Sequence, residues 1–350
     1  MQDDSSKQKS LHSDYGEQSR EREKGHRFSL TGSGWGKGFV SEARLDRRML
    51  KPYFWPNWLG VFLYFLLVTV LPYRLQMLLG RVLGRLYGRL TPNRTYVLRR
   101  NLELAYPQLD EAQRERLKER VLESSGMAIF EVGMAWFWPD WRLKRLAIIS
   151  SEDLARGRAL AAQNKPVIVL TCHYVTLEIM ARLYALYIKP GIGVYRPSDH
   201  PVWEYTQVKG RLRNNLALVN AKDPRSMIKA LMNRVPIWYA PDQDYGAKAS
   251  VFVPFFGVDK AATVVGTHNL AKVKDTVVQP SFTVREHGKY HLYVWDTLEN
   301  FPTEDAQADA RRCNEVLEKM ISLAPEQYLW LHRRFKTVPD GEDSRYPDLK

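Results

Sequence analysis

The sequence is poor in cysteine, and its two cysteines, Cys172 and Cys313, are not spaced as a pair. Two isolated thiols exclude a disulfide framework and argue for a reducing compartment. Histidines are also few, and the one close pair, His287 and His291, is a weak metal-ligand signal more typical of strand-associated surface residues. We therefore expect neither a metal nor a cofactor.

Charge is missing from one stretch, and acidic residues are missing from the next. Residues 52–73 contain no charged residue, and residues 74–100 contain seven arginines but no aspartate or glutamate. The first stretch has aromatic ends and just reaches the length of about 20 residues that spans a bilayer. It therefore predicts a membrane anchor, with a buried core helix as the alternative.

The second stretch has the pattern of an amphipathic helix. On a helical wheel its apolar residues occupy one part of the surface, and the opposite side carries Arg74, Arg81, Arg85 and Arg89. A basic, amphipathic helix beside an anchor is expected to lie on an anionic membrane surface. The alternative is an ordinary solvated helix, which the lack of acidic partners disfavours.

The amino-terminal residues are polar, rich in serine, glycine and mixed charge, and without an apolar period. This composition predicts a disordered tail, and the lack of an apolar signal region predicts that it is not removed. The expected organisation is a tail over residues 1–43, an anchor over 44–73, the basic helix over 74–100 and a globular domain over 101–345.

The net charge of +13 favours anionic partners. The basic residues flank the anchor or stand singly in loops, and the chain has no RNA-recognition signature, zinc finger or arginine-rich arm. We therefore expect an anionic membrane and lipid phosphates as partners, and no nucleic acid.

Short apolar runs alternate with amphipathic stretches through the globular part. The runs predict strands at residues 166–171, 192–195, 235–240, 277–284 and 290–295. The stretches predict helices at residues 109–138, 176–187, 202–214, 224–233, 264–273 and 306–323. This alternation predicts an α/β fold with a mixed, mostly parallel sheet flanked by helices, preceded by an N-terminal membrane anchor helix.

One strand ends in a reactive pair of residue types. In "TCHYVTLE", His173 follows the apolar run and Glu178 stands five residues later. Five helical steps separate two side chains by about 140°, so the two meet only if His173 lies on the turn and Glu178 in the first helical turn. A neutral imidazole oriented by a carboxylate is a general base for a hydroxyl. The spacing alone is a weak signal.

Cys172 is the rival nucleophile beside this histidine. Adjacent residues of a strand point to opposite faces, so Cys172 and His173 are poorly placed to act together. We interpret Cys172 as a small buried residue, and we expect the attacking hydroxyl to belong to the substrate.

Charged residues follow other strand ends. Arginines there bind phosphate or carboxylate groups, and the alternative is ordinary salt bridging with neighbouring aspartates. The candidate binding residues are Arg196, Arg211, Arg213, Asp242, Asp244, Arg333 and Arg334.

These segments together resemble a known family. "TCHYVTLE", "GVYRPSDHP", "KGRLRNN", "VPIWYAPDQDYG", "SVFVPFFG" and "APEQYLWLHRRFKT" resemble the lipid A biosynthesis acyltransferases of Gram-negative bacteria. The resemblance is strongest to the lauroyl or palmitoleoyl branch that acts on Kdo(2)-lipid IV(A), within the wider H-x4-D/E acyltransferases. It covers roughly residues 50 to 345, and the tail has no counterpart.

The resemblance implies an acyltransferase domain with His173 as general base and Glu178 as its orienting carboxylate. It implies an acyl carrier protein thioester as donor and a hydroxyacyl chain of a phosphorylated glycolipid as acceptor. It also implies a location in the bacterial inner membrane, with the catalytic domain on the cytoplasmic face. The alternatives are an acyl thioesterase, a glycerolipid acyltransferase and a non-catalytic membrane-binding module. The preferred acyl-chain length stays open.

Overall fold

The computed structural model describes residues 38–349, so the predicted tail over residues 1–43 lies mostly outside the described residues. The strands of the described part are β1 Phe39–Val40, β2 Ala147–Ile148, β3 Val167–Leu170, β4 Ile192–Tyr195, β5 Ala217–Asn220, β6 Ile237–Tyr239, β7 Ser250–Phe255, β8 Val258–Val264, β9 Val277–Glu286 and β10 Lys289–Val294.

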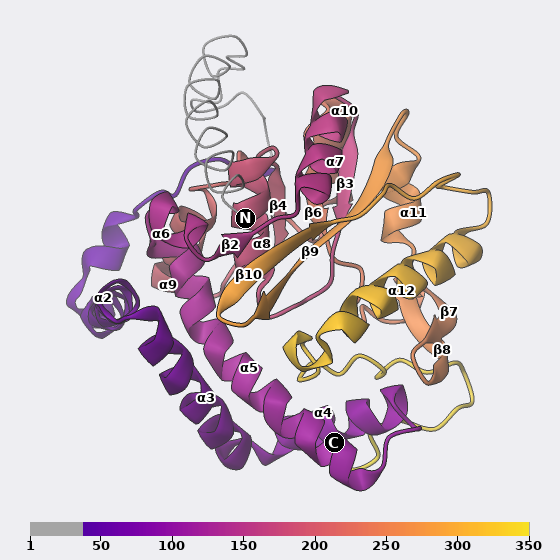
Figure 1. Ribbon diagram of the computed structural model, residues 1–350, viewed down its shortest axis with the longest axis horizontal. Helices are drawn as coiled ribbons and strands as arrows, with labels where there is room; N and C mark the ends of the chain where they lie inside the picture. The colour runs from indigo at the N-terminus through magenta and orange to yellow at the C-terminus, as the bar shows by residue number, and fades with distance from the viewer. Residues whose placement is uncertain (1–37, 350) are drawn as a thin grey trace, which may run out of the picture.

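The helices surround these strands (Figure 1). They are α2 Trp55–Val70, α3 Tyr73–Leu90, α4 Pro92–Ala105, α5 Glu111–Phe137, α6 Asp140–Lys144, α7 Ser151–Ala162, α8 Leu177–Tyr187, α9 Pro201–Arg211, α10 Pro224–Met232, α11 Gly266–Ala271 and α12 Ala306–Leu323. Short 3-10 turns lie at η1 Arg47–Leu50, η2 Pro52–Phe54, η3 Ala247–Ala249 and η4 Pro325–Gln327.

The main sheet of the described residues has the order β1-β5-β4-β6-β3-β9-β10-β2. The strands from β5 to β9 are parallel, whereas β10 is antiparallel to β9 and β1 is antiparallel to β5. A separate antiparallel pair, β7 and β8, packs beside α12. The predicted α/β fold with a mixed, mostly parallel sheet is confirmed.

Alternation along the central strand divides the core between the two faces of the sheet. Ile168 and Leu170 of β3 belong to the cluster that includes α10, α11 and α12. Val167 and Val169 belong to the cluster that includes α7, α8 and the second half of α5. Successive strand residues point to opposite faces, so both faces of a parallel strand must be apolar, and "PVIVL" meets this demand.

The five predicted strands and six predicted helices all form. The elements that the sequence patterns did not predict are the helices α6 and α7, the short 3-10 turns and the strands β1, β2, β5, β7 and β8. One of them corrects the predicted tail: Phe39 and Val40 form an edge strand that pairs with Val219 and Leu218 of β5. Residues 39 and 40 therefore belong to the sheet rather than to the predicted tail.

The predicted anchor forms a helix with an exposed apolar surface. Among the described residues, one helical stretch, residues 52–70, is long and apolar enough to cross a membrane. Only 6% of this stretch is buried. The exposed side chains of α2 include Trp55, Leu59, Phe62, Leu63 and Val70. The end of the helix is nonetheless attached to the domain, since Val68 is fully buried and its carbonyl oxygen accepts from Trp138 Nε1 at 2.8 Å.

The predicted basic helix over residues 74–100 is instead two helices, α3 and α4, which are separated at Thr91. α4 belongs to the core, where Val97, Leu98 and Leu102 are buried. The arginine stripe also has one acidic partner, because Arg85 Nε donates to Glu123 of α5 at 2.8 Å. The pair was not predicted because its two residues lie far apart in the sequence.

α3 turns its glycines inward and its leucines outward. A methyl group at Gly84 would overlap the carbonyl oxygen of Leu122, and one at Gly126 of α5 would overlap that of Gly80. The two helices therefore approach backbone to backbone, which only glycine permits. The exposed side is apolar and carries Leu75, Leu78, Val82, Leu83, Leu86 and Leu90.

Candidate active site

The register of two parallel strands places His173 beside Asp242. Leu170 of β3 pairs with Tyr239 of β6, and the next backbone N–H, that of Thr171, still donates to Tyr239 at 3.0 Å. Both strands end at the same edge of the sheet, and each candidate residue lies three positions beyond the paired residues. Ligands of open α/β sheets bind at this carboxyl edge.

Asp242 holds His173 by its ring and by its backbone. Nδ1 of His173 lies 2.7 Å from Oδ1 of Asp242, and the backbone N–H of His173 donates to Oδ2 at 2.9 Å. An ionised carboxylate only accepts hydrogen bonds, so Nδ1 carries the proton and Nε2 is left as the basic nitrogen. Both oxygens of Asp242 are thus bound to His173, and the predicted role of Asp242 in substrate binding stays a prediction.

The turn that carries His173 is held by the segment 327–330. Leu329 N–H donates to the carbonyl oxygen of His173 at 3.0 Å, and Val175 N–H donates to that of Gln327 at 2.8 Å. Tyr328 is buried, and its hydroxyl donates to the carbonyl oxygen of Asp242 at 3.4 Å. Backbone bonds on both sides of the imidazole fix its place before any substrate binds.

The electrostatics of the pair keep Asp242 ionised. Burial raises the pKa of Asp242, but its attraction to His173 and the hydrogen bonds from His173 lower it further, so that the net pKa lies below the ordinary value. Burial lowers the pKa of His173, while the charge and the hydrogen bond of Asp242 raise it more, and the net pKa is raised. The positive charge of Arg211 opposes this rise.

Glu178 lies in the first turn of α8, as expected, but its carboxylate is bound elsewhere. Oε1 accepts from Arg211 Nε at 2.8 Å and from Nη2 at 2.5 Å, and Oε2 accepts from Trp136 Nε1 at 3.1 Å. Among residues 38–349 no hydrogen bond joins Glu178 to His173. The expected direct pairing of these two side chains is therefore replaced by the pairing of His173 with Asp242.

The structure does not gather the other predicted binding residues into one cluster. Arg196 is exposed and pairs with Asp199 at 3.5 Å. Arg213 is exposed and donates to the carbonyl oxygen of Trp136 at 2.8 Å. Arg333 is exposed, near the segment that holds the His173 turn. Their role in binding stays a prediction.

Two further predicted binding residues have structural partners instead. Asp244 is buried, and its oxygens accept from Gly246 N–H, from Thr337 N–H and from the Thr337 hydroxyl. Arg334 is 1% exposed and donates to the carbonyl oxygen of Ala262 at 2.6 Å. The polar groups of both residues attach the C-terminal segment to the fold, and their role in binding stays a prediction.

His332 stands in the basic motif "LWLHRRFKT" but was not among the predicted site residues. Its Nε2 accepts from the backbone N–H of Asp244 at 3.4 Å. Burial lowers the pKa of His332 to about 4, an effect that Asp242 opposes and His173 reinforces. A neutral imidazole therefore lies close to the His173–Asp242 pair. Only the folding of the C-terminal segment over the β6 end brings it there.

Cys172 fits the interpretation of a buried small residue. It is fully buried, and burial, with the nearby charge of Asp242, raises the pKa of its thiol. A thiol in that state is not a nucleophile at neutral pH. Within residues 38–349 no group of three or more His, Cys, Asp or Glu side chains is placed to hold a metal ion.

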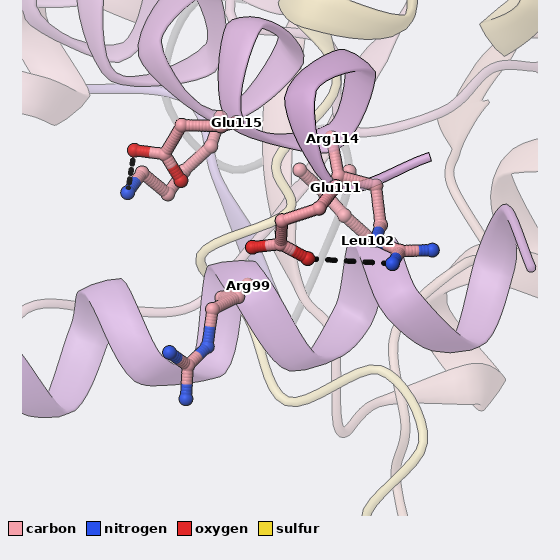
Figure 2. Close-up of a pocket in the computed structure, with 6 residues that line it drawn as sticks. Arg99, Leu102, Glu111, Arg114 and Glu115 are labelled. Carbon is pink, nitrogen blue, oxygen red and sulfur yellow. Dashed lines mark hydrogen bonds and ion pairs between the residues drawn. The ribbon is translucent and has the colours of Figure 1, made fainter. Parts of the chain in front are cut away.

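Ion pairs also fill the surface depression between α4 and α5 (Figure 2). It is lined by Arg99, Leu102, Glu111, Arg114, Glu115 and Lys118. Arg114 pairs with Glu111 at 3.3 Å, and Lys118 pairs with Glu115. Both ion pairs lie within α5 and give the charged residues of this depression partners of their own, so the strand-edge pair is the better candidate.

Comparison with known proteins gives one family. The model of the bacterial lipid A biosynthesis acyltransferases matches residues 42–337, a range that contains His173, Glu178, Arg211 and Asp242. The chain is similar to the lipid A biosynthesis lauroyltransferase of Escherichia coli (strain K12), with 43% identity over 87% of this chain and 98% of that protein.

Two other relatives from the same strain extend the comparison. The lipid A biosynthesis palmitoleoyltransferase is 38% identical over 87% of this chain and 99% of its own length. The lipid A biosynthesis myristoyltransferase is 28% identical over 86% of this chain and 93% of its own length. The similarity spans both the sheet and the helices before it.

Proposed function

The chain belongs to the bacterial lipid A biosynthesis acyltransferases, and on that premise we propose that it transfers an acyl chain from acyl carrier protein to Kdo(2)-lipid IV(A). The acceptor group is the 3-hydroxyl of a hydroxyacyl chain on this phosphorylated glycolipid. The chain is an acyltransferase by its family. The proposal adds the donor, the acceptor and the mechanism.

The mechanism rests on one observation: the imidazole of His173 is partly exposed at the carboxyl edge of the sheet. Its side chain is 25% exposed, and Asp242 occupies Nδ1. Nε2 takes the proton of the substrate hydroxyl as the hydroxyl oxygen attacks the thioester carbonyl carbon. When the intermediate collapses, the carbon–sulfur bond breaks and the thiolate takes the proton from His173. The products are an ester and a free thiol.

Direct transfer requires no protein nucleophile. Cys172 is the thiol next to His173 in the chain, but it is fully buried with a raised pKa. The oxyanion of the tetrahedral intermediate needs preorganised donors, for which Arg196 is a candidate. The backbone amides of the His173 turn were the other expected donors, but those of His173, Tyr174 and Val175 already donate within the protein.

The surface of α2 and α3 supports a location at the bacterial inner membrane. Both helices expose apolar side chains, and α3 adds the exposed arginines Arg81 and Arg89. Figure 1 shows α2 nearly end-on and α3 lengthwise, so the two helices lie crosswise. α2 therefore enters the bilayer while α3 lies along its surface, with the catalytic domain on the cytoplasmic side where acyl carrier protein is found. The net charge of +13 suits an acidic carrier protein.

Purified enzyme with acyl carrier proteins of several chain lengths tests the activity. The acceptor is the tetra-acylated lipid precursor, and mass spectrometry follows the acylated product. We expect product with at least one carrier and none without enzyme. Free fatty acid released without acceptor would identify a thioesterase. Acylation of glycerol phosphate instead would identify a glycerolipid acyltransferase, and lipid binding without transfer would identify a membrane-binding module.

Two changes test the membrane surface. Replacing Arg81 and Arg89 by glutamine is expected to weaken binding to anionic vesicles by about 1 kcal/mol per charge. Neither residue packs in the core, so the thermal unfolding midpoint should stay the same. The control is Arg85→Gln, in which the replaced side chain already pairs with Glu123. Unchanged vesicle affinity would contradict the proposed orientation.

A further inference from the structure

We infer that Asp242, rather than Glu178, is the carboxylate that positions His173, and that Glu178 positions Arg211, which binds an anionic group of the substrate. The inference rests on the proposed function and divides the site into two charged pairs with separate tasks. One pair sets the state of the base, and the other orients a cation beside it.

Asp242 has the geometry of a positioning residue for the imidazole. It is fully buried, and its two oxygens accept from one residue, at 2.7 Å from the ring and 2.9 Å from the backbone of His173. Two bonds to the same residue fix both the ring rotation and the place of the ring on the turn. They also fix the tautomer in which Nε2 faces the substrate as an acceptor.

Glu178 has the geometry of a positioning residue for a guanidinium. Its Oε1 accepts two hydrogen bonds from Arg211, and its Oε2 is taken by Trp136. The helix α8 that carries Glu178 is thereby joined to α9 and α5. This arrangement fixes the plane of the guanidinium and leaves Glu178 no hydrogen bond for the imidazole.

Arg211 is placed to meet a ligand. Its side chain is 25% exposed, and among residues 38–349 its Nη1 makes no hydrogen bond. Its charge acts on His173, so the guanidinium lies within electrostatic range of the base. Phosphate and carboxylate groups both match the free edge of a guanidinium. The lipid acceptor proposed above carries groups of this kind.

Kinetics separate the two tasks. Asp242→Asn is expected to lower kcat by roughly 10²–10⁴-fold, the usual contribution of a positioned base, with little change in the KM for the lipid. Glu178→Gln and Arg211→Gln are expected to raise that KM more than they lower kcat. Because they act as one unit, the double variant should be no worse than the poorer single variant.

The chain supplies a matched control. His268 and Asp309 form a second pair with the same Nδ1–carboxylate distance of 2.7 Å, and both are buried. Asp309→Asn breaks this pair without touching the sheet edge. We expect unchanged kcat and KM per folded molecule, so a loss in Asp242→Asn is not explained by breaking a buried pair as such.

The pH profile adds a readout that a purely structural role would not change. The charged and titratable groups that act on His173 are Asp242, Arg211 and His332, and those that act on its partner Asp242 include Tyr328, Tyr245 and Cys172. Asp242 is the group that raises the pKa of His173 against burial. Its replacement should move the acidic limb of kcat/KM to lower pH, and Asp309→Asn should leave that limb in place.

Nuclear magnetic resonance of ¹⁵N-histidine-labelled protein decides the point without any activity. The His173 signal is assigned by its loss in His173→Gln. We expect Nδ1 to carry the proton in the wild type and in Glu178→Gln, and to lose it in Asp242→Asn. If Asp242→Asn does not fold, the wild type and Glu178→Gln still decide.

The outcomes distinguish this inference from the proposed function. An Nε2-protonated His173 in the wild type, or a change of tautomer in Glu178→Gln, would overturn the inference. Wild-type kcat and an unmoved acidic limb in Asp242→Asn would overturn it too. Absence of transfer from any carrier to the lipid, with the tautomers as expected, would refute the proposed function and leave the positioning of His173 intact.

Discussion

Two histidine–aspartate pairs in this molecule share one geometry and differ in surroundings. In each, Nδ1 lies 2.7 Å from a carboxylate oxygen. The side chain of His173 is 25% exposed at the sheet edge, whereas that of His268 is 3% exposed between α11 and α12. The two pairs thus have the same short contact and differ in solvent access to Nε2. His173 can therefore react with a substrate, whereas His268 has a structural role.

The carboxylates differ in the same way. Asp242 gives both of its oxygens to His173. Asp309 divides its oxygens between His268 and Thr303, whose N–H and hydroxyl donate at 2.8 and 3.1 Å. A carboxylate that binds a single histidine sets the tautomer and pKa of that histidine. A carboxylate that binds two segments of the chain holds them together, and its loss is expected to lower stability.

The largest expected effect comes from replacing each of the two histidines by alanine. His173→Ala should lower transfer by roughly 10²–10⁴-fold, whereas His268→Ala should keep transfer per folded molecule. Both changes leave a buried aspartate without its imidazole partner, so both should lower the unfolding midpoint, at a cost of about 3–5 kcal/mol. Activity per folded molecule and thermal unfolding of both variants check this. Full activity in His173→Ala would make both histidines structural.

The pH dependence of the wild type gives the next effect. Transfer needs neutral His173, and its raised pKa means that it gains a proton at a higher pH than a free histidine does. Activity should therefore be complete above that pKa and fall as the pH drops through it. The pH profile of kcat/KM checks the sign. Activity that rises as the pH falls would contradict a general base at this position.

Two arginines near the C-terminus extend the comparison to buried and exposed positions. Arg334→Met should destabilise the protein by about 1–3 kcal/mol, because the carbonyl oxygen of Ala262 loses its buried donor. Arg333→Met, at an exposed position, should leave stability within about 0.5 kcal/mol. Urea unfolding checks both variants. Equal stability of the two would contradict the structural role of Arg334.

The smallest effect on activity is expected at the two cysteines, one beside each pair. Burial raises the pKa of Cys172, and it raises that of Cys313 to about 12. Cys172→Ser and Cys313→Ser should each cost about 1–3 kcal/mol of stability as a hydroxyl replaces a buried thiol. Both should keep transfer per folded molecule. A labelled acyl group trapped on Cys172 would replace direct transfer by a covalent intermediate.

Much of the framework was readable from local patterns. "PVIVL" predicts a strand buried on both faces, and the alternation of such runs with helical stretches predicts the α/β sheet that forms. The strands β5, β7 and β8 were not predicted. They are stabilised by neighbouring strands, and this contribution cannot be seen in the hydrophobic pattern of the strand's own residues. For the same reason the ion pair of Arg85 with Glu123 was not predicted. A helical pattern describes a single helix, whereas this ion pair joins two helices.

The sequence by itself determined that a histidine ends a buried strand, with a carboxylate five residues later and an aspartate after another strand. The partnerships were decided only by the tertiary structure. Parallel pairing of Leu170 with Tyr239 puts Asp242 beside His173, and the packing of both α8 and α9 against α5 brings Arg211 to Glu178. A hydrogen bond depends on which elements are neighbours in space, and strand order and helix packing set that.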